Sequence, residues 1–318
     1  MKEVKQPLVS IIFITYNSSR YLLEKLESVK KQTYRNIELI ITDDYSLDDT
    51  VAICKNWVDR NKDRFVRTEI ISAERNTGIP SNCNRGVKKS QGEWVKLIAG
   101  DDILLESCIE DNVEFINENA DAKFVISELL EINDNGCLIC NHKGKREKDN
   151  WIRFYFNAKT AEKQLKAYAR WPVFLNAPTY FMNRQLLEDI DFFDEEYKIF
   201  EDTTLMYRVN SNDTIIFFMS KPTVKYRIHD KAVSRKASKN DDRDKEVLSI
   251  FKKYREENLS KSNLIDLCIY YEIWLNYNWR GYKGHRGSRV LGKLSLFYWY
   301  SKYIIYKLEK LEVGQKSK

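Results

Sequence analysis

Two adjacent carboxylates, Asp101 and Asp102, follow an apolar stretch that ends at Ala99. The stretch 93–99 (EWVKLIA) has the composition of a buried strand, and paired acids at the end of such a strand are disfavoured by repulsion and poor solvation. A hard divalent cation such as Mg²⁺ or Mn²⁺ would relieve the repulsion, and it leaves room for substrate phosphates. The pair therefore indicates a candidate metal site.

A second acidic pair, Glu201 and Asp202, precedes an apolar helical pattern in FEDTTLMYRV (200–209). One interpretation is that these acids only complement the dipole at a helix N-terminus. The other is that one of them is a general base. The residues alone leave both interpretations open. His229, in YRIHDKAVS, is one of only 3 histidines in the chain, and a lone histidine is more often structural than a metal ligand.

Strand-like and helical patterns alternate before these residues. Apolar, β-branched runs at 8–15, 37–42, 65–72 and 93–99 predict strands buried on both faces of a parallel sheet. Helical spacing follows in 20–32, in 50–61 and within 74–92, and Ser46 with Asp49 resembles a capping box before the second helix. The alternation predicts an α/β fold with an open, mostly parallel twisted sheet.

Ligands of such sheets bind beyond the carboxyl ends of the strands. Three polar clusters of this chain fall there, at the ends of the first, second and fourth predicted strands: Thr15-Tyr16-Asn17, Asp43-Asp44 and Asp101-Asp102. Each cluster alone is compatible with a turn or a cap. Three clusters at one edge of the sheet predict a binding site.

Bulk properties set limits on the function. The chain has 318 residues, 43% of them hydrophobic, with a net charge of +6, which does not by itself imply nucleic acid. Its 6 cysteines are scattered, as expected in a reducing compartment. Cys137 and Cys140 form a C-x-x-C, which we interpret as part of a β-hairpin turning at Asn135-Gly136 rather than as a zinc site. The N-terminus does not resemble a signal peptide and no apolar run reaches membrane-spanning length, so we expect a cytoplasmic protein.

The chain lacks the sequence motifs of several enzyme classes. No G-x-G-x-x-G follows the first predicted strand, and the chain contains neither a G-x-x-x-x-G-K-[ST] phosphate loop nor a G-x-S-x-G elbow. Hydride transfer, ATP hydrolysis and serine-esterase chemistry are therefore disfavoured. The remaining chemistry is acid-rich and compatible with a metal ion.

The chain resembles the family 2 glycosyltransferases of the GT-A fold, inverting enzymes that use nucleotide sugars and include bacterial O-antigen and capsule transferases. The first four motifs of the resemblance cover about residues 8–105 and are jointly specific; the last two are weaker but fall in the expected order. The motifs are VSIIFITYN (9–17), IELIITDDYSLDDT (37–50), NTGIPSNCNRG (76–86), GEWVKLIAGDD (92–102), FDEEYKIFEDTTLMYRV (193–209) and YRIHDKAVS (226–234).

The resemblance implies roles for single residues. Tyr16 and Asp44 would contact the uracil and ribose of a UDP-sugar. Four further residues would lie in the same nucleotide-binding region: Thr15, Asn17, Asp43 and Asn76. Asp101 would coordinate Mn²⁺ or Mg²⁺ at the diphosphate, with Asp102 assisting and His229 as a further metal or diphosphate contact.

The resemblance also implies that Asp202 is the general base, with Glu201 beside it. The chain departs from the family pattern at two positions. Ala99 stands where the first acid of the D-x-D metal motif is expected, and Cys83 stands where an arginine is common. Each departure removes a contact that the family usually has.

The resemblance implies one GT-A domain with a nucleotide-sugar half (1–105) and an acceptor-binding, catalytic half (106–238), followed by a helical region (239–318). We expect a saccharide acceptor, lipid-linked in one interpretation. The basic, aromatic segment 283–307 would then contact the cytoplasmic face of the inner membrane, or it would pack on the protein's own core or on a second copy in a homodimer.

Two other functions stay open from the sequence. A nucleotidyltransferase also places metal-binding acids on an α/β sheet, but it would have a Gly-rich basic loop after the first strand. A non-catalytic module that binds nucleotide sugars or glycans would lack a base, whereas Asp202 is present. Trp171 and Tyr180 have two interpretations as well, stacking on a sugar or packing in the core, of which packing is the more common.

Overall fold

The computed structural model describes residues 5–99, 102–139, 155–170, 176–228, 241–260, 262–263, 266–267 and 269–271. The chain divides into two compact units. The first unit comprises Met1–Leu165 and Val173–Arg235, and the second comprises Lys166–Pro172 and Lys236–Lys318. Asp101, Cys140, Trp171, His229 and the segment 283–307 lie outside the described residues.

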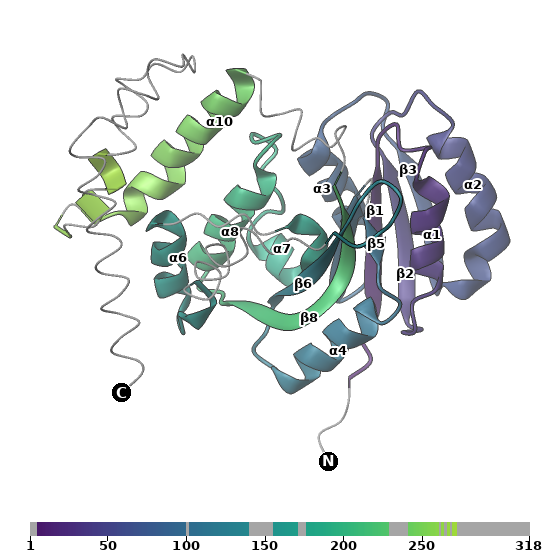
Figure 1. Ribbon diagram of the computed structural model, residues 1–318, viewed down its shortest axis with the longest axis horizontal. Coiled ribbons are helices and arrows are strands. Elements are labelled where there is room, and N and C mark those ends of the chain that lie inside the picture. Colours follow the sequence, from purple (N-terminus) through teal and green to yellow (C-terminus); the bar gives the residue numbers. More distant parts are fainter. Residues whose placement is uncertain are drawn as a thin grey trace. The chain divides into compact units, whose positions relative to one another are not determined.

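A parallel sheet forms the N-terminal half of the first unit (Figure 1). Its strands run in the spatial order β3-β2-β1-β4, and Thr15 at the end of β1 lies in register with Asp43 at the end of β2. Every residue of β1 and β2 is buried, as the continuous apolar runs predict. The bounds are β1 (Val9–Thr15), β2 (Ile37–Asp43), β3 (Arg67–Ser72) and β4 (Trp94–Ala99).

Helices cover both faces of this half. Leu26 of α1 and Trp57 of α2 belong to the same apolar core as Phe13 of β1. On the other face α3 packs so closely that a Cβ atom on Gly86 would overlap the side chain of Ile12. The bounds are α1 (Leu22–Lys30), α2 (Thr50–Asn61), η1 (Lys62–Arg64) and α3 (Ile79–Lys89).

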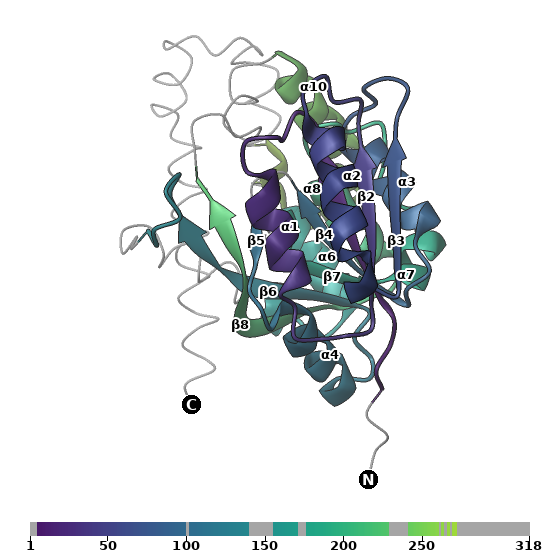
Figure 2. The same cartoon turned by 90° about the vertical axis from the view of Figure 1, so that its right-hand side faces the viewer.

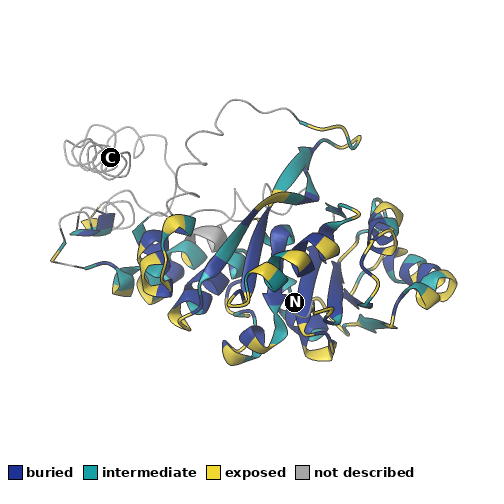
Figure 3. Cartoon of the chain, turned by 90° about the horizontal axis from the view of Figure 1, so that it is seen from below, coloured by how far each residue is buried: buried dark blue, intermediate teal, exposed yellow. Residues whose placement is uncertain are grey.

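The sheet continues through antiparallel and parallel pairs in the order β4-β7-β6-β8-β5 (Figure 2). β8 is long, and its ladder with β6 shifts register between Ser127 and Leu129. Figure 3 shows the strands mostly buried, with exposed surface on the outer sides of the helices. The bounds are β5 (Ile103–Leu104), α4 (Cys108–Glu118), β6 (Phe124–Ile132), α6 (Ala161–Arg170), η2 (Ala177–Thr179), β7 (Tyr180–Asn183), α7 (Arg184–Asp189), α8 (Glu201–Ser211) and β8 (Ile216–Arg227).

The second unit contains α10 (Asp241–Ile250), a π-helical turn at Phe251–Arg255 and η5 (Glu256–Asn258). Within this unit the Arg170 guanidinium pairs with the buried Asp266 carboxylate at 2.5 Å. Arg255 also donates to the carbonyl oxygen of Arg170 at 2.9 Å. No helix among the described residues is long and apolar enough to cross a bilayer.

The predicted fold class is confirmed, because helices flank a mixed sheet whose N-terminal half is parallel throughout. The predicted capping box is wrong. Ser46 does not cap α2, because its hydroxyl donates to Asp43 instead, and the N-cap residue Asp49 makes no side-chain capping bond. The hairpin after β6 is present, with Gly136 at φ 78° and a bridge between Ile132 and Leu138.

Candidate active site

The loops after β1 and β2 are joined by side chains that the sequence predicted to lie together. The Asp43 carboxylate accepts hydrogen bonds from the Thr15 hydroxyl at 2.8 Å and from the backbone N–H of Ser46 at 2.8 Å. Asn17 accepts from the backbone N–H of Leu47 at 2.9 Å and donates its own N–H to the Ser46 hydroxyl at 2.8 Å. Asp43 and Asn17 therefore hold the two loops in one fixed arrangement.

Asp44 is buried and accepts several hydrogen bonds from the loop before α3. Its carboxylate receives the hydroxyl of Thr77 at 2.6 Å and the backbone N–H of Gly78 at 2.8 Å. The side-chain amide of Asn76 donates to the backbone carbonyl of Asp44 at 3.3 Å. The structure thus brings Asp44 and Asn76 together, and it gives Asp44 a clear part in shaping the loop 76–78.

Arg85 is a residue of this region that the sequence interpretation missed. Its guanidinium pairs with Asp44 at 3.4 Å and donates to the hydroxyl of Thr77 at 2.8 Å. It also donates to the side-chain oxygen of Asn82 at 2.8 Å. Cys83, which stands where an arginine is common in the family, is a buried thiol. The sequence feature that could have identified Arg85 is its position, two residues after Cys83 on the same helix.

Asp102 lies three residues after β4, directly before β5, and is only 5% exposed. Its Oδ1 accepts the backbone N–H of Arg227, the last residue of β8, at 3.3 Å. The buried Arg227 guanidinium pairs with Glu24 at 2.7 Å and donates to the carbonyl oxygen of Asp134 at 2.8 Å. β8 therefore ends beside Asp102, which is how residues more than 100 positions apart meet.

The predicted metal ligands Asp101 and His229 lie outside the described residues. Within the described part of the chain, no three His, Cys, Asp or Glu side chains form a metal-binding group. Carboxylate oxygens such as those of Asp102 are ligands that Mn²⁺ and Mg²⁺ prefer, so the chemistry of this side chain is compatible with a cation.

Lys96 is a buried lysine in β4, three residues before the strand ends. The side chain is 0% exposed, and among the described residues its ammonium group has no hydrogen-bond partner. Burial lowers the pKa of Lys96, and the charges of Cys108 and Asp102 offset only part of this effect. The sequence showed a lysine in an apolar strand but did not show that it is fully enclosed.

Glu201 and Asp202 form the first turn of α8, so the structure places the second acidic pair at a helix N-terminus. Burial raises the pKa of Asp202 from 3.8 to about 6, and hydrogen bonds from the N–H and hydroxyl of Thr203 offset part of that rise. The N–H of Thr203 lies 2.6 Å from Asp202 Oδ1. A carboxyl group with a pKa near neutrality is suited to accept a proton in catalysis.

The segment before α8 is fixed from two sides. Asn84 of α3 donates to the carbonyl oxygen of Phe193 at 2.9 Å and accepts from its N–H at 2.9 Å. The Ser81 hydroxyl donates to Glu195 at 2.6 Å, and Arg208 of α8 donates to the carbonyl oxygen of Phe192 at 2.7 Å. α3 therefore contacts both the Asp44 loop and the segment that leads into α8.

Tyr180 is buried at the start of β7, and its ring lies edge-on to Phe124 with centroids 5.1 Å apart. This packing supports the core interpretation of Tyr180. Tyr16 is the opposite case, because its side chain is 50% exposed beyond β1. Of the two tyrosines, only Tyr16 is available to a ligand at the carboxyl ends of the strands.

Comparison with known proteins agrees with this arrangement. The family model for glycosyl transferase family 2 matches residues 10–191, which is more than half of the chain. The uncharacterised glycosyltransferase MJ1057 of Methanocaldococcus jannaschii is 26% identical over 227 residues, which is 69% of this chain and 77% of that protein. The chain spans from 41% to 77% of the lengths of the first relatives it matches.

Two solved structures share the fold. TarS residues 1–349 of S. aureus, in complex with UDP-GlcNAc, matches with a TM-score of 0.55 at 22% identity, over 84% of this chain and 78% of that chain. The mannosyltransferase PcManGT of Pyrobaculum calidifontis, in complex with GDP-Man and Mn²⁺, matches with a TM-score of 0.55 at 14% identity, over 94% of this chain and 87% of that chain. At these low identities, the TM-scores show a common fold and nothing more.

The fold is that of the GT-A class. The chain belongs to glycosyl transferase family 2, and the protein is a glycosyltransferase.

Proposed function

We propose that this protein is an inverting glycosyltransferase that moves a sugar from a UDP-sugar to a hydroxyl group of a saccharide acceptor, in the synthesis of a surface polysaccharide. The observation that carries the proposal is the placement of Asp202. This carboxylate has a raised pKa, and α3 connects its segment through Asn84 to the loop that surrounds Asp44. A general base and a nucleotide-binding region that α3 connects suit the direct transfer of a sugar from donor to acceptor.

Asp202 is the general base of the proposed reaction. Its carboxylate removes the proton from the acceptor hydroxyl as the oxygen attacks the anomeric carbon, and Glu201 lies beside it. The bond from that carbon to the diphosphate oxygen breaks in the same step, so a single displacement inverts the anomeric configuration. No carboxylic acid has to protonate the leaving group, because a diphosphate leaves as an anion.

On the donor side, Tyr16 contacts the base, and Asp44 with Asn76 shapes the loop that receives the nucleoside. Thr15, Asn17 and Asp43 hold the loops after β1 and β2 through the hydrogen bonds described above. The UDP-GlcNAc bound to TarS supports a uridine nucleotide as the donor. Asp101, Asp102 and His229 would hold Mn²⁺ or Mg²⁺, which when bound stabilises the negative charge that builds on the diphosphate.

The acceptor is a saccharide, lipid-linked where the enzyme works at a bilayer surface. Contact with the cytoplasmic face of a membrane through the segment 283–307 belongs to this proposal. Flotation with vesicles of anionic lipid tests that contact. Protein that stays at the bottom of the gradient with both anionic and neutral vesicles would remove membrane contact from the proposal and leave the transferase activity untouched.

Calorimetry with a panel of donors tests the central proposal. UDP-, GDP- and dTDP-sugars are titrated in Mn²⁺ and in EDTA, into the wild type, Asp101→Ala and Asp202→Asn. We expect Mn²⁺-dependent binding of a UDP-sugar that Asp101→Ala abolishes and Asp202→Asn retains. A wild type that binds none of the nucleotides would contradict the proposal, and an NMR assignment of the product anomer tests inversion.

A further inference from the structure

Tyr45 directly follows Asp44 at the end of β2 and has two unusual properties. Its side chain is 46% exposed, although tyrosine usually buries most of its ring. Its backbone has φ 69°, in the left-handed region that favours glycine and asparagine and that a bulky residue seldom adopts. Tyr45 is not part of the buried apolar core, so core packing does not explain this conformation.

The conformation of Tyr45 is enforced by its surroundings. Ser46, the next residue, donates both its N–H and its hydroxyl to the Asp43 carboxylate. The backbone N–H of Asp44, the preceding residue, donates to the carbonyl oxygen of Thr15 at 3.0 Å. The residues on both sides are thus fixed to Thr15 and Asp43, and Tyr45 takes the strained geometry between them. Strain that is held in this way often serves a site.

The ring of Tyr45 has a counterpart on the neighbouring strand. Tyr16 follows β1 as Asp44 follows β2, since Thr15 and Asp43 are in register, and Tyr16 is 50% exposed. Among the described residues no aromatic ring stacks on Tyr16 or on Tyr45. Two half-exposed tyrosines therefore follow the carboxyl ends of adjacent parallel strands, where such sheets bind ligands.

We propose that Tyr45 is a second stacking residue for the nucleobase of the donor, in addition to Tyr16. This inference rests on the proposed function, because it needs a nucleotide at this edge. A base has two flat faces, and aromatic side chains stack on such faces whatever the base is. Tyr45 should therefore contribute affinity for the nucleoside part of every donor, without choosing among uracil, thymine and guanine.

A pair of substitutions separates the ring from the backbone conformation. Tyr45→Asn removes the ring and introduces a residue that tolerates the left-handed region, whereas Tyr45→Phe keeps both the ring and the strain. We expect Tyr45→Asn to weaken UMP binding about tenfold, the scale of one lost stacking contact, and to leave the melting temperature unchanged or raised. Tyr45→Phe should bind UMP within about twofold of the wild type. A Tyr45→Asn variant that binds UMP more weakly but is at least as stable as the wild type would identify Tyr45 as a binding residue.

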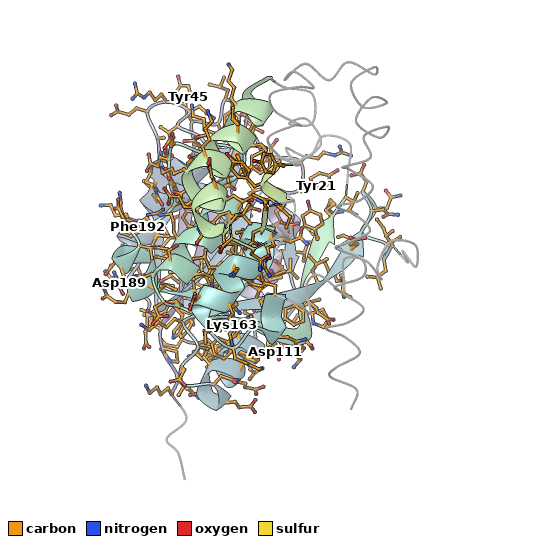
Figure 4. The ribbon with its side chains drawn as sticks, turned by 90° about the vertical axis from the view of Figure 1, so that its left-hand side faces the viewer. Tyr21, Tyr45, Asp111, Lys163, Asp189 and Phe192 are labelled. Atoms are coloured by element: carbon orange, nitrogen blue, oxygen red, sulfur yellow. The ribbon has the colours of Figure 1, made fainter. Side chains whose placement is uncertain are left out.

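Phe192→Asn is the matched control, because Phe192 is also an aromatic residue in the left-handed region, at φ 58°. Figure 4 labels Tyr45 and Phe192 at separate places in the structure. Phe192→Asn should leave the dissociation constant of UMP unchanged. UMP contains no donor sugar, so the measurement isolates the nucleoside, and titrations with GMP and dTMP should show the same loss for Tyr45→Asn.

The outcomes distinguish this inference from the proposed function. A wild type that binds neither UMP nor any nucleotide sugar would contradict the proposed function itself. A wild type that binds UMP, together with an equal affinity of Tyr45→Asn, would overturn the role of Tyr45 alone. An unchanged UMP affinity with a raised KM for the acceptor would assign Tyr45 to the acceptor, and this also overturns the inference.

Discussion

Two regions of the first unit contain carboxylates whose pKa values shift in opposite directions. Glu38 lies on β2, beside the edge strand β3 and near the amino ends of the parallel strands, and is fully buried. Burial alone would raise the pKa of Glu38, but hydrogen bonds from Ser10, Gln91 and Gly92 and the pair with Arg67 outweigh it, and the pKa is lowered. Asp202, at the other region, has few donors, and burial raises its pKa to about 6.

The difference separates a carboxylate held by several hydrogen-bond donors from one whose pKa is raised by burial. The Glu38 carboxylate receives the Ser10 hydroxyl at 2.5 Å and the Gly92 N–H at 2.9 Å, so its charge is bound on several sides. A carboxylate in that state is a poor base. Burial instead raises the pKa of Asp202 to about 6, which is what the general base of the proposed function requires.

The largest expected effect is on turnover by Asp202→Asn. The substitution removes the base but keeps the size of the side chain, so kcat should fall by about 10³-fold with little change in the donor dissociation constant. Single-turnover kinetics with saturating donor measures this. Asp213→Asn replaces an exposed acid just beyond the other end of α8 and should leave kcat unchanged. A loss of less than fivefold in Asp202→Asn would contradict the role of base.

The pH profile of the wild type sharpens the same prediction. Because the base acts ionised, kcat/KM should fall about tenfold per pH unit below pH 6 and level off above it. The contribution of Asp202 to stability depends on pH in the opposite direction. The folded-state pKa of Asp202 is raised above 3.8, so its ionisation makes stability fall as pH rises from about 4 to about 6. Asp202→Asn should lack this fall, which denaturant unfolding at several pH values measures.

The next largest effect is on stability, by Glu38→Gln. The neutral amide cannot form the ion pair that Glu38 makes with Arg67 at 2.9 Å. Its NH₂ group would also face hydrogen-bond donors of the pocket that need an acceptor. The free energy of unfolding should therefore drop by about 3 kcal/mol. Urea unfolding at pH 7 measures the drop, and kcat per folded molecule should not change.

Glu69→Gln is the matched control, because Glu69 pairs with the same arginine but has a side chain that is 30% exposed. It should cost at most about 1 kcal/mol, as partly exposed pairs do. The folded-state pKa of Glu38 is lowered, so its contribution is present above pH 4.5 and is lost as pH falls further. Equal losses in the two variants would mean that burial does not distinguish the two acids.

The fold could be predicted from local patterns of apolar residues. The β-branched runs placed β1 and β2 to within two residues, because a strand buried on both faces must be apolar throughout. They also placed Asp43 and Asp44 at the end of β2. Ser46 shows the limit of such patterns, since its hydroxyl had both a helix N-terminus and Asp43 within reach, and only the folded chain shows that it bonds Asp43.

The residues that the sequence did not predict depend on distant contacts or on backbone geometry. Arg227 meets Asp102 only because β8 pairs with β6 along its whole length. Arg85 reaches Asp44 only because α3 packs against β2, which Gly86 permits. The left-handed φ of Tyr45 is imposed by bonds of its neighbours. No spacing rule within a single segment contains this information.

The smallest of the three effects is a gain in stability by Lys96→Met. The ammonium group of Lys96 is fully buried without a hydrogen-bond partner among the described residues, and methionine fills a similar volume without a charge. The free energy of unfolding at pH 7 should rise by about 1–2 kcal/mol, because burying an unpaired charge is costly. Calorimetric melting of the two proteins measures the gain.

The sign of the pH dependence tests the cause. The folded-state pKa of Lys96 is lowered, so the unfolded chain binds more protons and the stability of the wild type should rise as pH approaches 10.5. Lys96→Met should lack that rise. Lys221→Met, which removes an exposed lysine paired with Asp111 at 2.5 Å, should instead lower stability slightly. If Lys96→Met is less stable than the wild type, the negative charge of Asp102 stabilises the Lys96 ammonium group. Lys96 would then be a stabilising buried charge, as Glu38 is.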